Sequence, residues 1–297
     1  MNKQHWAYYY VHDWVDNQAQ MYANMVAARN KGITGFFLSC WIDHQEEIDQ
    51  AFAASVPSGM QMGILLENPE RTVAERCHFA AQLLDKYENH PRLIKVQSNP
   101  KVPPKPPIIV YSPAWTSGDV GVWSEGLAPL RSRAYFIGDV LKELMMDIFD
   151  GITNYNPATM MKRNMAGDVI QDRASYDQMR LCTLKVAELC KSQKKFYFPP
   201  IMAHFDDSAN PNRDPHTVLE FRNGELFWET VWAADQCDPQ YAPIRILVTA
   251  NEQDEQSHFL GTWAMQQIAL QMVGVSQRLW INQGKPFADP ALYTMPD

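Results

Sequence analysis

Two glutamates, Glu252 and Glu255, follow the apolar run at residues 246–249. On a continuous strand, side chains three residues apart point to opposite faces, roughly 10 Å apart at about 3.3 Å per residue. If the strand ends at Glu252 and the chain turns, both carboxyls line one pocket. Glycoside cleavage requires such a pair, one carboxyl to protonate the leaving oxygen and one to act as base or nucleophile. The alternative is a solvated acidic loop entering a helix, whose N-terminus Asp254 and Glu255 would favour.

The other residues that could do chemistry lie at or just after the carboxyl ends of the predicted strands. In chain order they are Tyr9, Tyr10, His12, Asp13, Trp14, Ser39, Trp41, Asp43, Glu67, Asn68, Tyr111, Ser112, Asp139, Asn154, Tyr155, His204, Asp206, Asp207, Asn251 and Asp254. Aromatic, carboxylate and amide groups predominate, and cations are few. Aromatic faces stack on sugar rings and carboxylates bind hydroxyls, whereas a phosphate needs Arg, Lys or glycine-rich turns. The set therefore favours a carbohydrate ligand, although any single aromatic residue here could instead cap the fold.

The elements that position these residues alternate along the chain. Periodicity predicts strands at residues 6–11, 33–40, 60–67, 108–111, 134–138, 151–155, 196–203 and 244–249. It predicts helices at residues 18–31, 45–54, 72–87, 140–149, 176–191, 225–235 and 261–273. Eight predicted strands that alternate with helices, joined by right-handed crossovers, predict an α/β fold, a single (β/α)8 TIM barrel, with its active site at the carboxyl ends of the strands.

The competing architecture is an open, doubly wound sheet. It is disfavoured because no GxGxxG or GxxxxGK[ST] motif follows a predicted strand. No Gly/Ser-rich or low-complexity linker divides the chain, so we expect one catalytic domain over residues 1–297.

Charge and cysteine content restrict the partners and the compartment. The net charge is −8 without a sustained basic patch, which argues against nucleic acid. Apolar runs fall far short of the ~20 residues of a membrane span. Five scattered cysteines, none in a CxxC pair, are interpreted as buried free thiols. The sequence has no signal-peptide pattern, so we expect a cytoplasmic protein or one exported with its signal removed.

An ordered set of segments resembles one enzyme family. Residues 251–255, Asn-Glu-Gln-Asp-Glu, resemble the N-E-x-x-E signature on the last strand of glycoside hydrolase family 99, the endo-α-mannosidases and endo-α-mannanases, and of family 99-like domains. Residues 6–14 are similar to its aromatic first strand, and 32–41 to its G-[VI]-x-G-F-x-x-S-x-W strand. Residues 63–68 resemble its third strand, 105–112 its K-P-x-x-x-x-Y strand and 205–207 its aromatic-Asp-Asp turn. Family members usually have Trp-His between the two glutamates, where this chain has Gln253 and Asp254.

The resemblance implies an endo-acting, retaining hydrolase of α-mannoside-type glycans that needs no metal or organic cofactor. By motif position, Glu252 would be the base that removes the proton of the sugar 2-hydroxyl, giving an anhydro-sugar intermediate. Glu255 would be the general acid, which at neutral pH requires a raised pKa. Substrate, an oligosaccharide or polysaccharide, would contact Tyr10, Trp41, Glu67, Tyr111, Asp206, Asp207, Asn251 and Asp254.

Three alternatives remain open at this point. A conventional double-displacement glycosidase would use Glu252 as acid/base and Glu67 as nucleophile. A barrel that binds carbohydrate without turnover would keep the fold and lose the chemistry. A metal-dependent hydrolase would use His12, Asp13, His204 and Asp206, but further histidines at strand ends are missing, and we expect no metal site.

Overall fold

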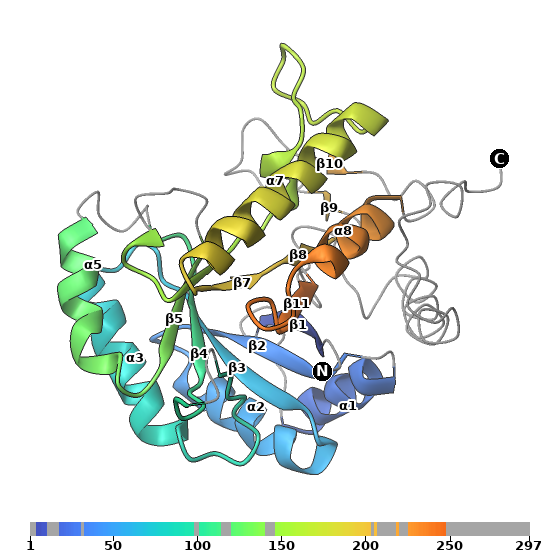
Figure 1. Ribbon diagram of the computed structural model, residues 1–297. Coiled ribbons are helices and arrows are strands. Elements are labelled where there is room, and N and C mark those ends of the chain that lie inside the picture. Colours follow the sequence, from blue (N-terminus) through green and yellow to red (C-terminus); the bar gives the residue numbers. More distant parts are fainter. Residues whose placement is uncertain are drawn as a thin grey trace.

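The computed structural model describes residues 4–10, 18–30, 33–97, 101–113, 120–139, 146–202, 205–206, 218–219 and 225–247. In these residues a ring of strands is surrounded by helices (Figure 1). The helices are α1 (Gln18–Asn30), α2 (Gln45–Ser58), α3 (Val73–Tyr87), α5 (Val120–Leu127), α7 (Arg173–Ser192) and α8 (Glu225–Gln236), with 3-10 turns η1 (Ala128–Leu130) and η2 (Pro157–Met160). A separate antiparallel pair is formed by β9 (Phe205–Asp206) and β10 (Val218–Leu219).

The main sheet consists of parallel strands. They are β1 (Gln4–Tyr10), β2 (Gly35–Cys40), β3 (Gln61–Leu66), β4 (Pro107–Val110), β5 (Tyr135–Asp139), β6 (Gly151–Thr153), β7 (Phe196–Phe198), β8 (Pro200–Ile201) and β11 (Ile244–Leu247). Their order is β7-β6-β5-β4-β3-β2-β1-β11-β8, and every described pairing is parallel. The predicted (β/α)8 barrel is thus confirmed.

One predicted strand, residues 196–203, is divided in two. β7 pairs with β6 and β8 pairs with β11, and only Pro199 separates β7 from β8. Proline has no N–H to donate, so the strand cannot keep one continuous hydrogen-bonded ladder across Pro199 and Pro200. The carbonyl of Pro199 still accepts a hydrogen bond from the backbone N–H of Ile246 at 3.0 Å. The two ends of the sheet therefore meet in this one segment and close the barrel.

The helices largely follow the predicted ranges. α2 extends past residue 54 to Ser58, where Gly59, with φ of 72°, ends it in the left-handed conformation. α3 begins at a capping box in which Thr72 and Glu75 exchange hydrogen bonds. α5 is not predicted from periodicity, because its eight residues include two glycines. Most of the predicted helix 140–149 and all of 261–273 lie outside the described residues.

Alternate residues of each strand form two apolar layers. Trp6 and Tyr8 belong to the layer inside the barrel, and Ala7 and Tyr9 to the layer beneath the helices. Further members of the inner layer are Phe37, Leu65, Ile109, Ile137, Phe196, Phe198, Ile244 and Ile246. This period of two carries past the ends of the strands, so it also decides which residues face the mouth of the barrel.

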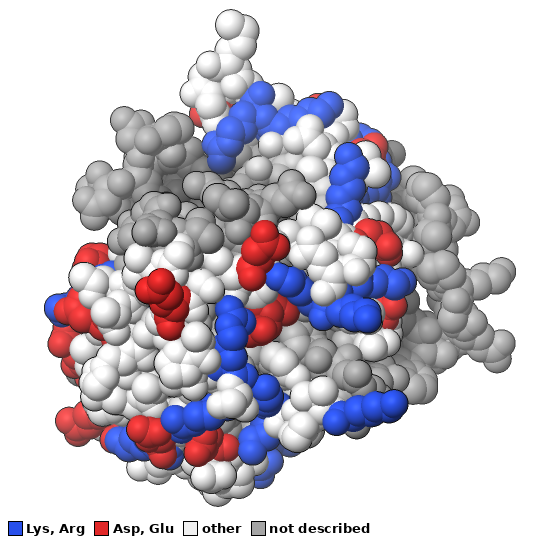
Figure 2. Space-filling view, turned by 60° about the vertical axis from the view of Figure 1, so that its left-hand side comes forward, with Lys and Arg blue, Asp and Glu red and all other residues white. Residues whose placement is uncertain are grey.

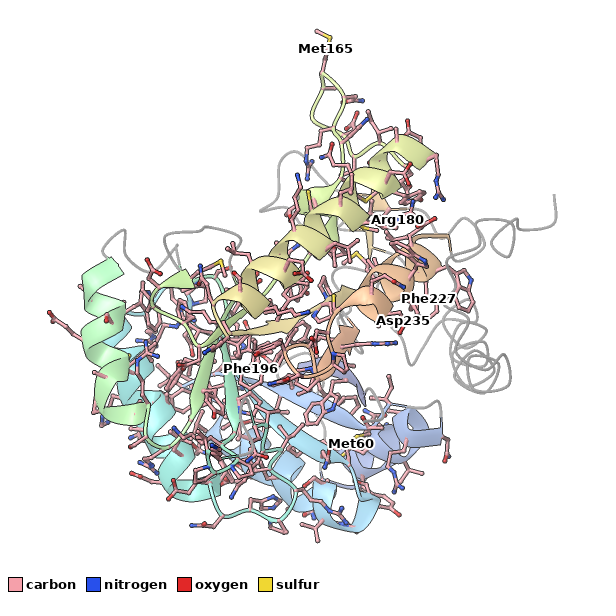
Figure 3. All side chains as sticks on the ribbon, in the orientation of Figure 1. Met60, Met165, Arg180, Phe196, Phe227 and Asp235 are labelled. Carbon is pink, nitrogen blue, oxygen red and sulfur yellow. The ribbon has the colours of Figure 1, made fainter. Side chains whose placement is uncertain are left out.

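Helices α7 and α8 pack together around a buried charge. Glu229 of α8 is 6% exposed and receives two ion pairs of 2.9 Å, from Arg173 and from Arg180 of α7. The Arg180 guanidinium also lies 4.7 Å from the ring centroid of Trp232. Figure 3 labels Arg180 where α7 runs beside α8, and Met165 at the tip of the loop that leads into α7. A hydrogen-bonded charge cluster therefore fixes this pair of helices.

On the molecular surface, charges of both signs lie close together. Figure 2 shows one face on which Lys and Arg side chains neighbour Asp and Glu side chains. Exposed ion pairs such as Lys86 with Asp49 contribute little stability each. In the part of the chain that the structure describes, no helix has the length and hydrophobicity needed to cross a membrane.

The glycines of the inner layer generate a stability prediction. A Cβ added to Gly63 would lie 2.5 Å from ring carbons of Phe37, which is itself fully buried. We expect Gly63→Ala to lower the free energy of unfolding by about 1–3 kcal/mol, because the packed interior cannot accept the added methyl group. Ala53→Ser, on the exposed surface of α2, is the control and should change it by less than about 0.5 kcal/mol. If urea titrations showed the same loss of unfolding free energy in Gly63→Ala and Ala53→Ser, the close packing of Gly63 against Phe37 would be contradicted.

Candidate functional site

Polar and aromatic residues lie at the carboxyl ends of five adjacent strands. Trp41 follows β2, Glu67 follows β3, Tyr111 follows β4, Asp139 ends β5 and Tyr155 lies two residues after β6. Because the strands are parallel and adjacent, these ends share one mouth of the barrel. Trp41, Glu67 and Tyr111, which the sequence proposes as ligand-binding residues, are thus brought to the same face.

Glu67 is held by a short chain of hydrogen bonds. Its side chain is 5% exposed, and its Oε1 accepts a hydrogen bond of 3.0 Å from the Ser39 hydroxyl. The same hydroxyl oxygen accepts a hydrogen bond of 3.0 Å from the indole Nε1–H of Trp41. Ser39 therefore orients both a carboxyl and an aromatic ring, and it does so from β2 across to β3.

Asp139 links the ends of three strands. Its Oδ1 accepts a hydrogen bond of 2.7 Å from the backbone N–H of Tyr155, and the carboxyl also accepts one from the backbone of Ser112. Burial raises the pKa of Asp139 to about 6, although the two N–H donors oppose that shift. A carboxyl with this pKa carries a proton in a substantial fraction of molecules under mildly acidic conditions.

Three tyrosines pack together beneath and beside these carboxyls. The Tyr155 ring lies 5.4 Å from the Tyr8 ring and 5.7 Å from the Tyr111 ring, the latter in an edge-on arrangement. Burial raises the pKa of Tyr8 well above its usual value, and the charges of Asp139 and Glu67 raise it further. Tyr8 therefore stays protonated and places a neutral hydroxyl in the electrostatic environment of both carboxyls.

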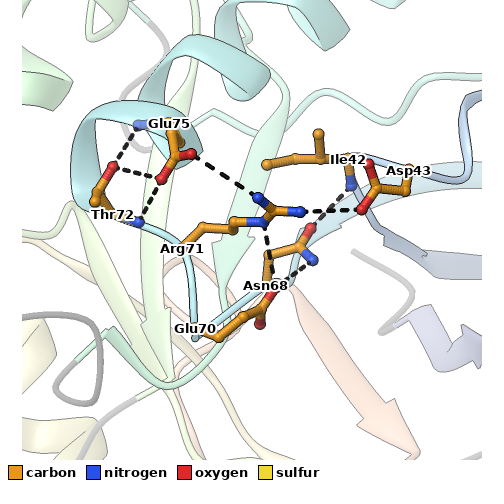
Figure 4. Close-up of polar contacts among 7 residues, drawn as sticks. All are labelled: Ile42, Asp43, Asn68, Glu70, Arg71, Thr72 and Glu75. Carbon is orange, nitrogen blue, oxygen red and sulfur yellow. Dashed lines mark hydrogen bonds and ion pairs between the residues drawn. The ribbon is translucent and has the colours of Figure 1, made fainter.

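The backbone just after β3 and β4 is in an unusual conformation. Asn68, directly after Glu67, has φ of 63°, and Ser112, directly after Tyr111, has φ of 42°. Left-handed backbone at non-glycine residues occurs where surrounding contacts enforce it, often at functional sites. The Asn68 side chain supplies one such contact, since its Oδ1 accepts a hydrogen bond of 2.8 Å from the backbone N–H of Ile42 (Figure 4).

A network of exposed charges supports the same loop. Arg71 pairs with Asp43 at 3.1 Å, with Glu70 at 3.6 Å and with Glu75 at 4.0 Å (Figure 4). These contacts join the turn after β2 to the turn after β3. The four side chains are 40–70% exposed, so each pair contributes little stability by itself.

The remaining predicted site residues lie outside the described residues. These are Glu252, Glu255, Asn251, Asp254 and Asp207, together with His12, Asp13 and His204 of the metal alternative. For Tyr10, the last residue of β1, and Asp206, in β9, only the backbone is described. The catalytic roles of Glu252 and Glu255 therefore remain a prediction.

Sequence reasoning gave no specific role to four residues of the mouth. Ser39, Asp139 and Tyr155 were recognisable as strand-end residues, but their hydrogen-bond and ring partners come from other strands. Tyr8 could have been found from the alternation of Trp6, Tyr8 and Tyr10, which predicts one face of β1. The signal for these residues is thus strand periodicity.

The described mouth can bind a neutral, hydroxyl-rich ligand. Glu67 and Asp139 supply carboxyl oxygens as acceptors, and the rings of Trp41 and Tyr111 supply apolar faces. Binding pockets of this kind fix a ligand by a few placed polar groups among aromatic walls.

Comparison with solved structures finds proteins that share this fold. A structure of the family 99 endo-α-mannosidase from Bacteroides thetaiotaomicron, in complex with BIS-TRIS propane, matches 94% of this chain and 98% of that chain, with a TM-score of 0.69 and 13% identity. A second structure of the endo-α-mannosidase from that organism matches 82% of this chain and 70% of that one, with a TM-score of 0.61 and 14% identity. A structure described as a glycoside hydrolase-like protein matches 87% and 86%, with a TM-score of 0.63 and 13% identity.

No protein-family model and no curated protein sequence matches the chain. At 13–14% identity the structural likeness establishes the fold. The resemblance to family 99 that the sequence indicates is confirmed at that level.

The hydroxyl bridge of Ser39 leads to a stability prediction. We expect Ser39→Ala to lower the free energy of unfolding by about 1–3 kcal/mol, because it removes the group that joins buried Glu67 to Trp41. The fluorescence of Trp41 should change in the folded state. Ser55→Ala is the matched control, since Ser55 is equally buried and bonds only locally, to the Phe52 carbonyl of its own helix. An equal loss in both variants would argue against a special role of Ser39.

The raised pKa of Asp139 predicts a pH-dependent stability. Its proton is bound more tightly in the folded than in the unfolded chain, so its stabilising contribution is complete below about pH 4 and is lost as the pH rises through about 6. The stability of the wild type relative to Asp139→Asn should therefore fall between pH 4 and pH 7.

Asp238 provides a control of opposite sign. The backbone N–H of Gln240 and the Lys191 ammonium lower the pKa of Asp238, so its contribution should be lost as the pH falls. Unfolding titrations at four pH values measure both trends. A stability difference for Asp139→Asn that stays constant from pH 4 to pH 7 would contradict the assigned environment.

Proposed function

We propose that this protein is a glycoside hydrolase that acts on α-mannoside-type glycans. The observation that carries the proposal is the mouth of the barrel, where Glu67, Trp41 and Tyr111 lie at strand ends matching the family 99 motifs. The likeness of the fold to family 99 endo-α-mannosidase structures supports the same assignment. The substrate is then an oligosaccharide or polysaccharide, and the reaction requires no cofactor.

In the proposed reaction, cleavage is endo-acting and retains the configuration at C1. Glu252 removes the proton of the sugar 2-hydroxyl, and this oxygen attacks C1 while Glu255 protonates the leaving oxygen. Glu255, now a carboxylate, then takes a proton from water as the water oxygen attacks C1, and Glu252 returns its proton to the 2-oxygen as the anhydro ring opens. The apolar run before Glu252 supports this assignment, since β11 (Ile244–Leu247) leads directly toward the same mouth.

The described residues have binding roles in this proposal. Glu67 accepts hydrogen bonds from sugar hydroxyls through its carboxylate, in the orientation that Ser39 sets. Trp41 and Tyr111 stack on sugar faces. Tyr10, Asp206, Asp207, Asn251 and Asp254 complete the lining, and Asp254 lies between the two catalytic glutamates in sequence, where its charge would raise the pKa of a neighbouring acid.

The test is hydrolysis of α-mannan and α-mannoside oligosaccharides, followed by mass spectrometry of the products. We expect the wild type to release oligosaccharides, and Glu252→Gln and Glu255→Gln to lose at least about a hundredfold in kcat/KM, the scale of general acid–base catalysis. Glu188→Gln, on the exposed surface of α7, is the matched control and should retain wild-type activity.

The other outcomes distinguish the alternatives. Release of single sugars alone would contradict endo cleavage. Glycan binding without turnover would favour a carbohydrate-binding barrel over an enzyme. A 2-deoxy-2-fluoro-mannoside with a good leaving group cannot form the anhydro sugar, so it should remain intact and leave no adduct. A glycosyl adduct on Glu67 from that substrate would instead establish double displacement.

A further inference from the structure

Arg76 is a fully buried cation directly behind the mouth of the barrel. It lies in the first turns of α3, and its side chain has no exposed surface. Its Nη2 donates hydrogen bonds to the carbonyl of Leu66, at 2.9 Å, and to the carbonyl of Tyr111, at 2.6 Å. Leu66 ends β3 and directly precedes Glu67. One guanidinium therefore joins the end of β3 to the end of β4.

The indole ring of Trp123, on α5, makes a cation–π contact with this guanidinium. The ring centroid of Trp123 lies 5.1 Å from the Arg76 Cζ, and its Nε1 donates a hydrogen bond of 3.1 Å to the carbonyl of Pro113. Arg76 and Trp123 thus bond the backbone carbonyls of Tyr111 and Pro113, the two neighbours of Ser112, whose φ is 42°. These two hydrogen bonds fix the backbone at Tyr111, directly after the end of β4.

The charge of Arg76 is coupled to the same site. Burial lowers the pKa of Arg76 to about 10, and the negative charges of Glu67 and Glu70 and the neighbouring Cys77 oppose that shift. The buried cation is therefore stabilised by Glu67, and by reciprocity it stabilises the charged form of Glu67.

We infer that Arg76 is a positioning residue of the glycan site, which fixes the strand ends carrying Glu67 and Tyr111 and stabilises the Glu67 carboxylate. The glycan part of this inference rests on the proposed function. Its geometric part rests on the hydrogen bonds of Arg76 to the Leu66 and Tyr111 carbonyls and on its contact with Trp123.

A buried arginine could instead serve stability only, and Arg245 is the control for that. Arg245 lies on β11, is 4% exposed, has a pKa lowered by burial to about 10, and pairs with Asp235 of α8. It belongs to the contact between barrel and helices and makes no described contact with Glu67 or Tyr111. Both arginines carry a similar burial cost, so similar losses of stability are expected from their replacement.

The experiment compares Arg76→Gln and Arg76→Lys with Arg245→Gln and Arg245→Lys. The first readout is the titration of the Glu67 carboxyl by ¹³C NMR, with Glu67→Gln identifying its resonance. In Arg76→Gln the midpoint should rise, and in Arg76→Lys, which keeps the charge, it should stay near the wild-type value. The Tyr111 ring resonances, identified with Tyr111→Phe, should move in both Arg76 variants, because the compact lysine ammonium cannot reproduce the planar guanidinium contact with Trp123 while it bonds the Leu66 and Tyr111 carbonyls.

The second readout is kcat/KM on α-mannan oligosaccharides as a function of pH. We expect a fall of about tenfold in Arg76→Lys, a larger fall with a displaced acidic limb in Arg76→Gln, and wild-type profiles in both Arg245 variants.

The outcomes separate this inference from the proposed function. A Glu67 titration that is the same in Arg76→Gln as in the wild type, or one that Arg245→Gln moves equally, overturns the inference. If Arg76→Gln does not fold, unchanged Tyr111 resonances in Arg76→Lys overturn it. A wild type without glycan hydrolysis or binding refutes the proposed function, while the two NMR readouts still decide the role of Arg76.

Discussion

The barrel closes because its seventh strand pairs on both sides, with β6 through Phe196–Phe198 and with β11 through Pro200–Ile201. Closure brings strands that are distant in sequence next to one another, so β1 and β11 pair over Gln4 to Ala7. It also places the carboxyl ends of all described barrel strands on one rim. The barrel therefore has an apolar interior and a polar mouth. The same alternation of side chains that fills the interior continues past the strand ends and places polar residues at the mouth.

The rim is joined from strand to strand by polar groups that are buried or partly buried. Ser39 connects β2 to Glu67, Arg76 connects the ends of β3 and β4, and Asp139 connects β5 to the segments after β4 and β6. Each bridge uses a side chain of one strand or helix to satisfy groups of the next, as buried polar groups require. The left-handed backbone at Asn68 is held within this system. These hydrogen bonds fix the positions of neighbouring strand ends relative to one another.

The strands of the barrel could be predicted because each one is a short apolar run between amphipathic segments, a local signal. An interruption of the predicted strand 196–203 could be expected from Pro199 and Pro200, since proline cannot donate a backbone hydrogen bond. Arg76 could not be assigned: in sequence it is a polar residue of an amphipathic helix, and its direction depends on how α3 packs on β3 and β4. The same holds for Asp139, whose partners come from two other strands. The roles of Arg76 and Asp139 depend on tertiary contacts, which the spacing of residues in the sequence does not reveal.

The most direct test of the account is a crystal structure of Glu255→Gln with an α-mannan oligosaccharide bound at a concentration that saturates binding in solution. The account predicts sugar rings at the rim, with hydroxyls hydrogen-bonded to Glu67 and ring faces against Trp41 or Tyr111. An oligosaccharide bound elsewhere on the molecule, with the mouth free of sugar, would contradict it.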